Sequence, residues 1–230
     1  LMRNLLDPRC QMLTVFGLGG IGKTSLSIAV ASKIAAAPGM NTHHPFADGI
    51  VRIDPQIEPA NGMSEDSEAE VAQYLEAIGI GLGIAFYGRV SLLEQVSAYL
   101  QNKNMLLVID NADCIPGAPT LLRDLLERSP LITILAVSRA PLGLPNEWTL
   151  ELPGLEVPAT PEDVPSAAAS QLVIRDALKI GVDICESDWP DLMALCRATG
   201  GLPLALKVAG NALSTLTCAE VACELAEGAM

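Results

Sequence analysis

An eight-residue segment of this chain has the residue types needed to bind a phosphate group. Gly17-Leu18-Gly19-Gly20-Ile21-Gly22-Lys23-Thr24 fits the pattern G-x-x-x-x-G-K-[ST]. Its glycines allow the backbone to turn with N–H groups pointing inward, and a following helix N-terminus would add partial positive charge. Lys23 would supply a charge for the β- and γ-phosphates, and the Thr24 hydroxyl would ligate Mg²⁺. The segment predicts a phosphate site and leaves the base and the reaction open.

A second segment offers an acid that would orient such a metal ion. Met105–Ile109 is a run of five apolar residues, and Asp110 follows it directly. Ligands of open parallel sheets bind beyond the carboxyl ends of the strands, so Gly17 and Asp110 are expected to converge there. We predict Asp110 as a Mg²⁺ ligand beside Thr24. The alternative is a carboxylate that only ends a strand.

Hydrolysis would also need a group that orients or deprotonates water. Asn111 can form a hydrogen bond but cannot act as a base. Asp113 either acts as that base or caps the segment that follows it, and the residues favour neither reading. Slow turnover is therefore expected.

Alternating strands and helices must position these residues. Apolar runs predict strands, and helical spacing of apolar residues predicts helices between them. The order indicates a three-layer α/β domain whose parallel sheet of about five strands is covered on both faces. An acidic stretch from Asp54 to Glu76 is interpreted as a solvated loop and helix face without a ligand. The predicted strands are 12–16, 49–53, 105–109, 132–137 and 149–152, and the predicted helices are 23–37, 90–102 and 119–128.

The last third of the chain differs from the part before it. Four prolines, at positions 153, 158, 161 and 165, predict a linker. Helical patterns follow over 167–179, 188–198, 204–213 and 218–226, with no strand signal between them. We therefore predict a nucleotide-binding α/β domain over residues 1–155 and a small all-helical subdomain over residues 156–230.

The charge balance excludes a protein that binds polyanions by bulk charge. The 230 residues include 14 Lys and Arg against 27 Asp and Glu, which gives a net charge of −13. Direct nucleic-acid binding is not expected, and no apolar run approaches the roughly 18 to 20 residues of a membrane-spanning helix. The six cysteines contain no Cys-x-x-Cys pair, so reduced, mostly buried thiols and a cytoplasmic location are expected. No basic n-region followed by an apolar h-region occurs, so no secretory signal is expected, and the opening at Leu1 is interpreted as that of an excised fragment.

Four motifs, in order, resemble the NB-ARC domain of the STAND class of signalling ATPases. They are GLGGIGKT, LLVIDNAD, ILAVSRAPLGLPNEWTLELPGL and GGLPLAL, and they extend over nearly the whole chain. The nucleotide-binding module of bacterial multidomain transcriptional regulators is the nearest resemblance. It makes the first two motifs Walker A and Walker B, and the helical subdomain ARC1-like. It also implies an hhGRE motif before the phosphate loop and a winged-helix subdomain after Met230, neither of which lies within these residues.

The resemblance also assigns roles to two residues that the sequence alone leaves open. It implies that Arg139, which follows Ser138 at the end of a strand, touches the γ-phosphate as the sensor 1 arginine. A surface arginine would explain the same position. It implies that Pro203 packs near the adenine, although on the residues alone Gly200-Gly201 reads as a helix C-cap and Pro203 as the first residue of a helix.

The candidate site follows from the motifs and the resemblance together. Its catalytic residues are Lys23, Asp110, Asp113 and Arg139, and its metal ligands are Thr24 and Asp110. Its nucleotide-binding residues are Gly17, Gly19, Gly20, Ile21, Gly22, Lys23, Thr24, Ser25, Arg139 and Pro203. The expected cofactors are ATP or ADP and Mg²⁺.

The function that these expectations favour is an ATP/ADP switch with slow Mg²⁺-dependent hydrolysis, in signalling or transcription regulation. The expected partners are adenine nucleotide, effector and sensor domains outside this segment, and further copies of the chain in a nucleotide-dependent assembly. A turnover ATPase or small-molecule kinase is the alternative, although neither an Arg-rich lid nor an acceptor pocket is evident. A GTPase is disfavoured because no N-K-x-D run occurs. A scaffold with a degenerate nucleotide site stays open.

Overall fold

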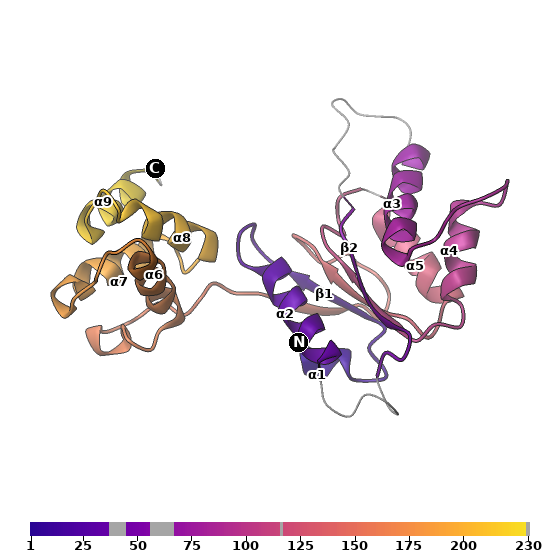
Figure 1. Ribbon diagram of the computed structural model, residues 1–230, viewed down its shortest axis with the longest axis horizontal. Coiled ribbons are helices and arrows are strands. Elements are labelled where there is room, and N and C mark those ends of the chain that lie inside the picture. The colour runs from indigo at the N-terminus through magenta and orange to yellow at the C-terminus, as the bar shows by residue number, and fades with distance from the viewer. Residues whose placement is uncertain (37–44, 56–66, 116, 229–230) are drawn as a thin grey trace. The chain divides into compact units, whose positions relative to one another are not determined.

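The computed structural model describes residues 1–36, 45–55, 67–115 and 117–228 and divides the chain into two compact units (Figure 1). The first unit contains Leu1–Gly17 and Lys23–Leu152. The second contains Leu18–Gly22 and Pro153–Met230.

The first unit is built on a five-stranded parallel sheet. Its strands are β1 (Met12–Phe16), β2 (Gly49–Ile53), β3 (Met105–Ile109), β4 (Thr133–Val137) and β5 (Trp148–Glu151), in the spatial order β2-β3-β4-β1-β5. β3 is buried along its whole length, because its side chains alternate between two apolar cores on opposite faces of the sheet. The α/β fold with a parallel sheet of about five strands, predicted from the sequence, is confirmed.

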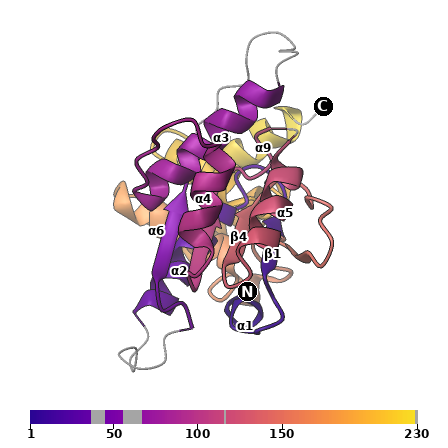
Figure 2. The same ribbon diagram turned by 90° about the vertical axis from the view of Figure 1, so that its right-hand side faces the viewer.

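Helices cover both faces of this sheet. On one face α1 (Met2–Leu5) and α2 (Lys23–Ala35) pack over Leu13, Val15 and Val108. On the other face lie α3 (Ser67–Leu82), α4 (Leu92–Leu100) and α5 (Ala118–Arg128), which Figure 2 shows in front of the strands. Helices therefore cover both faces of the sheet, as predicted for a three-layer α/β domain.

The long helix α3 was predicted only as the helix face of the acidic stretch from Asp54 to Glu76, without bounds of its own. Its acidic residues include Glu68 and Glu76, and these dominated the interpretation as a solvated loop and helix face. Its buried side chains Tyr74, Leu75, Ile78 and Leu82 follow helical spacing and pack on the sheet. Residues 56–66 of that acidic stretch lie outside the described residues.

The second unit is helical in its described residues from 153 onward. It contains α6 (Ala168–Lys179), α7 (Trp189–Ala198), α8 (Pro203–Ala212) and α9 (Cys218–Gly228), with short 3₁₀ turns at Pro161–Asp163 and Glu186–Asp188. α6 packs on α8, and α7 packs on α9, around an apolar core that includes Val173, Leu192 and Leu206. The all-helical character predicted for this region is confirmed.

The turn before α8 brings two backbone segments of the second unit together. The Leu155 N–H donates to the Gly201 carbonyl at 2.8 Å, and Pro203 is the first residue of α8. The interior of the phosphate loop, Leu18–Gly22, belongs to the same unit by its contacts, since the Leu204 N–H donates to the Gly20 carbonyl at 3.2 Å. Pro203 therefore precedes a residue that contacts the phosphate loop.

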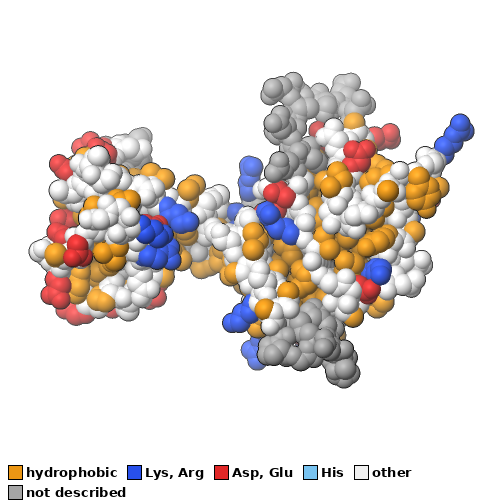
Figure 3. All heavy atoms as spheres, viewed as in Figure 1, with side chains coloured by type: hydrophobic (Ala, Val, Ile, Leu, Met, Phe, Trp, Pro, Cys, Tyr) orange, Lys and Arg blue, Asp and Glu red, His pale blue; other side chains and the backbone are white. Residues whose placement is uncertain are grey.

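Side chains of both charge signs are dispersed over the face that Figure 3 shows, together with scattered hydrophobic ones. Within the described residues no helix is long and apolar enough to cross a membrane. All six cysteines are free thiols. The expectation that they are mostly buried holds for Cys10, Cys196 and Cys218, whereas Cys185 and Cys223 are exposed.

Candidate functional site

The parallel register brings the predicted chemistry to one edge of the first unit. β1 and β3 both pair with β4, so that Thr14 and Ile109 lie opposite the same residue, Ala136. Gly17, Asp110 and Arg139 each follow these strands within a few residues. The carboxyl ends of β1, β3 and β4 therefore carry the candidate residues, as expected for an open parallel sheet.

The backbone of the phosphate loop has conformations that residues other than glycine rarely adopt. Gly20 has φ of 76° and Gly22 has φ of 95°, and both values lie in the left-handed region that glycine accepts at low cost. α2 begins at Lys23, directly after the loop, and Ser25 is exposed in its first turn. The strand, glycine turn and helix N-terminus thus follow each other as the motif requires.

Lys23 lies among the charged residues of the candidate set. Its Nζ donates a hydrogen bond to the Gly17 carbonyl at 2.8 Å. Burial lowers the pKa of Lys23, while the charges of Asp113 and Asp110 raise it and that of Arg139 lowers it. All four predicted catalytic residues therefore lie close enough together to interact electrostatically.

Thr24 and Asp110 are in direct contact. The Thr24 hydroxyl donates to Asp110 Oδ1 at 3.0 Å, and the Asn111 N–H donates to the same oxygen at 3.2 Å. Asp110 is buried, with 4% of its surface exposed. The predicted metal pair is therefore in direct contact, although the two residues are 86 positions apart.

The other oxygen of Asp110 has a partner that the sequence motifs did not reveal. Arg52, in β2, donates from Nη2 to Asp110 Oδ2 at 3.0 Å and to Asp54 Oδ2 at 3.3 Å. Among the described residues, Asp54 Oδ1 is buried without a hydrogen-bond partner. The signal that could have revealed both residues is a pair of charges, two positions apart, at the carboxyl end of an otherwise apolar strand.

Asp113 and Arg139 meet through the backbone. The Arg139 N–H donates to Asp113 Oδ2 at 3.1 Å, and both residues are exposed. This contact joins Asp113 to the loop after β4, 26 positions away, and not to the segment that follows Asp113. The catalytic roles of Asp113 and Arg139 stay predictions.

The oxygen atoms around Asp110 suit a hard divalent cation. Mg²⁺ prefers oxygen ligands, and this site offers the Thr24 hydroxyl and the Asp110 carboxylate. A cation would also compensate the charge of a buried carboxylate, which here is balanced by Arg52. The residues therefore fit the metal that the phosphate motif implies.

Comparison with known proteins relates the chain to bacterial regulators. No family model matches it. It is 27% identical over 222 residues to a Mycobacterium tuberculosis protein provisionally named an HTH-type transcriptional regulator, covering 96% of this chain and 22% of that protein. It is 25% identical over 221 residues to an uncharacterized M. tuberculosis protein, covering 96% of this chain and 50% of that protein.

Two further similarities concern other multidomain proteins. A WD repeat-containing protein of Nostoc is 31% identical over 114 residues, which cover 49% of this chain and 8% of that protein. The crystal structure of a STAND protein with a tetratricopeptide repeat sensor from Pyrococcus horikoshii aligns with 99% of this chain and 32% of its own, at 18% identity and a TM-score of 0.47. The chain has a five-stranded parallel sheet with a phosphate loop after β1, and it is similar over nearly its whole length to mycobacterial proteins, one of which is provisionally named an HTH-type transcriptional regulator.

Proposed function

We propose that this chain is the ATP/ADP-binding switch module of a larger signalling or transcriptional regulator, with slow Mg²⁺-dependent ATP hydrolysis. The observation that carries the proposal is the contact of Thr24 with the buried carboxylate of Asp110, close to the glycine turn and Lys23. A structural turn would need neither the buried acid nor the lysine beside it. The proposed arrangement has the α/β domain at residues 1–155 and the helical subdomain at 156–230.

Each residue has a distinct role in this proposal. Backbone N–H groups of the phosphate loop and the N-terminus of α2 hold the phosphates, and Lys23 neutralises their charge. Thr24 and Asp110 would hold Mg²⁺, which when bound neutralises charge on the β- and γ-phosphates. Arg139 would contact the γ-phosphate, Asp113 would orient water, and Pro203 would pack near the adenine.

A switch needs contacts that differ between its two nucleotide states. A ligand shifts a conformational equilibrium only by its difference in affinity for the two conformations. ATP and ADP differ by the γ-phosphate, for which Lys23 and Arg139 are the proposed protein contacts. Exchange of ADP for ATP would thereby re-pack the helical subdomain and permit self-association.

The surrounding protein belongs to the same proposal. The chain spans 22% to 50% of the length of the mycobacterial relatives described above. We assign effector and sensor domains to the remainder, with DNA contacts made by an HTH domain outside this chain, and we place the protein in the cytoplasm. A net charge of −13 supports the view that this module itself does not contact DNA.

Nucleotide binding to the Lys23→Ala variant tests the phosphate site. The substitution removes a charged hydrogen-bond donor worth about 1.5 to 3 kcal/mol, so ADP affinity should fall by about tenfold or more. Lys33→Ala is the matched control, because Lys33 is exposed in the last turn of the same helix. Isothermal titration calorimetry with ADP measures both. Equal ADP affinity in wild type and Lys23→Ala would refute the proposal.

ATP turnover separates the switch from the alternative. Under the proposal the chain hydrolyses ATP far more slowly than about 1 s⁻¹, the lower end of ordinary enzyme turnover. A faster rate would favour a turnover ATPase or kinase. Light scattering coupled to size exclusion, with ADP and with a non-hydrolysable ATP analogue, would report nucleotide-dependent self-association.

A further inference from the structure

The Arg52 guanidinium joins two carboxylates at the candidate metal site. Its Nη2 atom lies 3.0 Å from Asp110 Oδ2 and 3.3 Å from Asp54 Oδ2. The side chain of Asp110 is only 6% exposed, whereas that of Arg52 is 45% exposed. Asp110 is therefore the buried member of this ion pair, and the Arg52 guanidinium reaches it from the surface.

Asp110 has both carboxylate oxygens engaged in this arrangement. Oδ1 accepts from the Thr24 hydroxyl and the Asn111 N–H, and Oδ2 accepts from Arg52. A buried carboxylate without a counter-ion is strongly unfavourable, and Arg52 supplies the positive charge that balances Asp110. A divalent cation at Asp110 would supply the same charge.

A guanidinium and a metal ion compete for such a carboxylate. Both are cations, both use the oxygen lone pairs of the acid, and they repel each other at short distance. Any binding of Mg²⁺ at Oδ2 must therefore be preceded or accompanied by loss of the contact with Arg52. The competition lowers the apparent affinity of the site for the metal.

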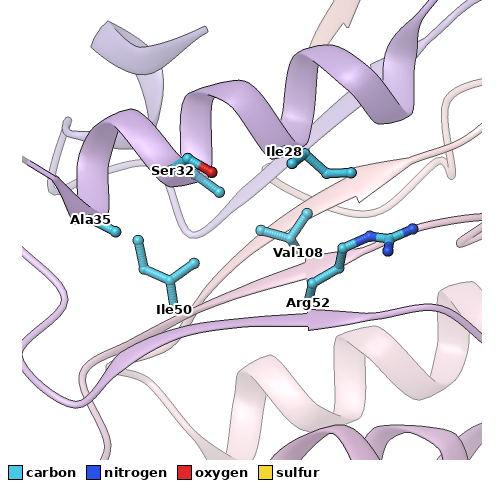
Figure 4. Close-up of a pocket in the computed structure, with 7 residues that line it drawn as sticks. Ile28, Ser32, Ala35, Ile50, Arg52 and Val108 are labelled. Atoms are coloured by element: carbon cyan, nitrogen blue, oxygen red, sulfur yellow. The ribbon is translucent and has the colours of Figure 1, made fainter.

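The surroundings of Arg52 make its release inexpensive. The same Nη2 atom already contacts Asp54, so the guanidinium keeps an anionic partner when it leaves Asp110. Figure 4 shows the Arg52 side chain beside Val108 in a groove of about 220 Å³ between α2 and β2, which Ile28, Ser32 and Ile50 also line. The side chain can therefore change rotamer without displacing a packed neighbour.

We propose that Arg52 is the counter-ion of Asp110 and that it sets the Mg²⁺ requirement of nucleotide binding by competing with the metal for the Asp110 carboxylate. Arg52 is in this role a positioning residue, because it acts through Asp110. The inference rests on the proposed function, and it adds a residue outside the four recognised motifs. It gives the switch a threshold in Mg²⁺ concentration.

Arg52→Met tests the competition directly, because methionine keeps an apolar stem and removes the charge. The Mg²⁺ concentration that half-saturates the increase in affinity for a fluorescent ADP analogue is measured in wild type and variant. We expect this midpoint to fall by about tenfold in Arg52→Met, the size of one charge-assisted hydrogen bond. Arg52→Lys keeps the charge and is expected to lie between the two. Arg123→Met is the matched control, since Arg123 pairs with Asp124 on the surface of α5.

The affinity for the ADP analogue in EDTA distinguishes competition from other roles. Competition predicts an unchanged dissociation constant for Arg52→Met without metal. An unchanged or higher Mg²⁺ midpoint would overturn the inference. Weaker binding of the ADP analogue to Arg52→Met in EDTA would also overturn the inference, because it would make Arg52 a direct phosphate ligand. If both proteins bind nucleotide and the Mg²⁺ midpoint is the same in wild type and Arg52→Met, only this inference is refuted. If wild type binds no nucleotide, the proposed function is refuted together with it.

A double-mutant cycle supplies a readout that needs no nucleotide. Urea unfolding of wild type, Arg52→Met, Asp110→Asn and the double variant gives the coupling between the two side chains. In EDTA we expect a coupling of about tenfold in the unfolding constant, because each single variant leaves one charge without its partner. With saturating Mg²⁺ and ADP the coupling should disappear. A coupling that persists with the ligand, or is absent without it, would contradict the exchange of Arg52 for metal.

Discussion

The glycine pair before α8 offers a sharp test of how the second unit is held together. Gly200 and Gly201 have φ of 58° and 69°, so an alanine at either position is strained by about 1 kcal/mol. Their surroundings differ. A Cβ atom on Gly200 would meet nothing within 4 Å, whereas one on Gly201 would lie 2.2 Å from the Leu155 carbonyl oxygen. Gly201→Ala must therefore move backbone, and Gly200→Ala need not.

The cost of Gly201→Ala can be assembled from these contacts. To the strain of about 1 kcal/mol it adds an overpacking cost of about 1 kcal/mol or more and the loss of the 2.8 Å hydrogen bond from the Leu155 N–H, worth about 1 kcal/mol. We expect the second unit to lose about 3 kcal/mol of unfolding free energy. With a urea slope of about 1.5 kcal/mol per molar, the unfolding midpoint falls by about 2 M.

Tryptophan fluorescence isolates the transition of the second unit. The chain has two tryptophans, Trp148 in β5 and Trp189 at the start of α7, so a Trp148→Phe background leaves a reporter in the helical unit alone. Urea titrations of Gly200→Ala and Gly201→Ala in that background give both midpoints. Equal shifts of about 1 kcal/mol for the two variants would refute the argument from backbone contact and leave only the conformational strain.

Two further perturbations address the metal site and the charge network of α6. Thr24→Val removes the hydroxyl that contacts Asp110 at constant shape, so the gain in ADP affinity on adding Mg²⁺ should shrink by about tenfold while Thr24→Ser retains it; an unchanged gain, measured by calorimetry, would exclude Thr24 from the metal site. The hydrogen bond from Lys179 lowers the pKa of buried Asp176 below its usual 3.8, so its stabilisation is complete above that value and is lost as pH falls through the lower folded value. The stability difference between wild type and Asp176→Asn should thus stay constant from pH 7 to about pH 5 and decline below about pH 4, and a difference that grows in acid would contradict the assignment.

Much of the first unit could be predicted from local sequence. The bounds of β1, β2 and β3 match the predicted ones, because each strand is a short run of mostly apolar residues with turn signals or charges at its ends. The helical bounds differ from prediction by one to two residues at most ends, where helices fray and capping decides the last turn. The bounds and the buried face of α3 were not predicted, because its exposed acids are more conspicuous than the apolar spacing from Val71 to Leu82.

Part of the candidate site was also evident from the residue types alone. Gly17–Thr24 and Asp110 stand out because their residue types are required by the chemistry and occur beside strands. The contact between Thr24 and Asp110 bears out the expected convergence of these two segments. Arg52 was not found, because its pairing with Asp54 at the end of β2 resembles an ordinary surface ion pair, and its contact with Asp110 depends on the neighbouring strand.

The sequence by itself determined the order of strands and helices and the residues of the phosphate motif, since both depend on near neighbours along the chain. Only the tertiary structure decided which charges meet. Asp110 receives Arg52 from 58 positions away because β2 and β3 pair in parallel with Ile53 beside Ile109. The end of α7 accounts for a left-handed glycine at Gly201, whose N–H bonds back to the Cys196 carbonyl, but only the tertiary structure places the Leu155 carbonyl against it. Such contacts depend on strand register and on the close approach of backbones, neither of which is encoded in any one stretch of residues.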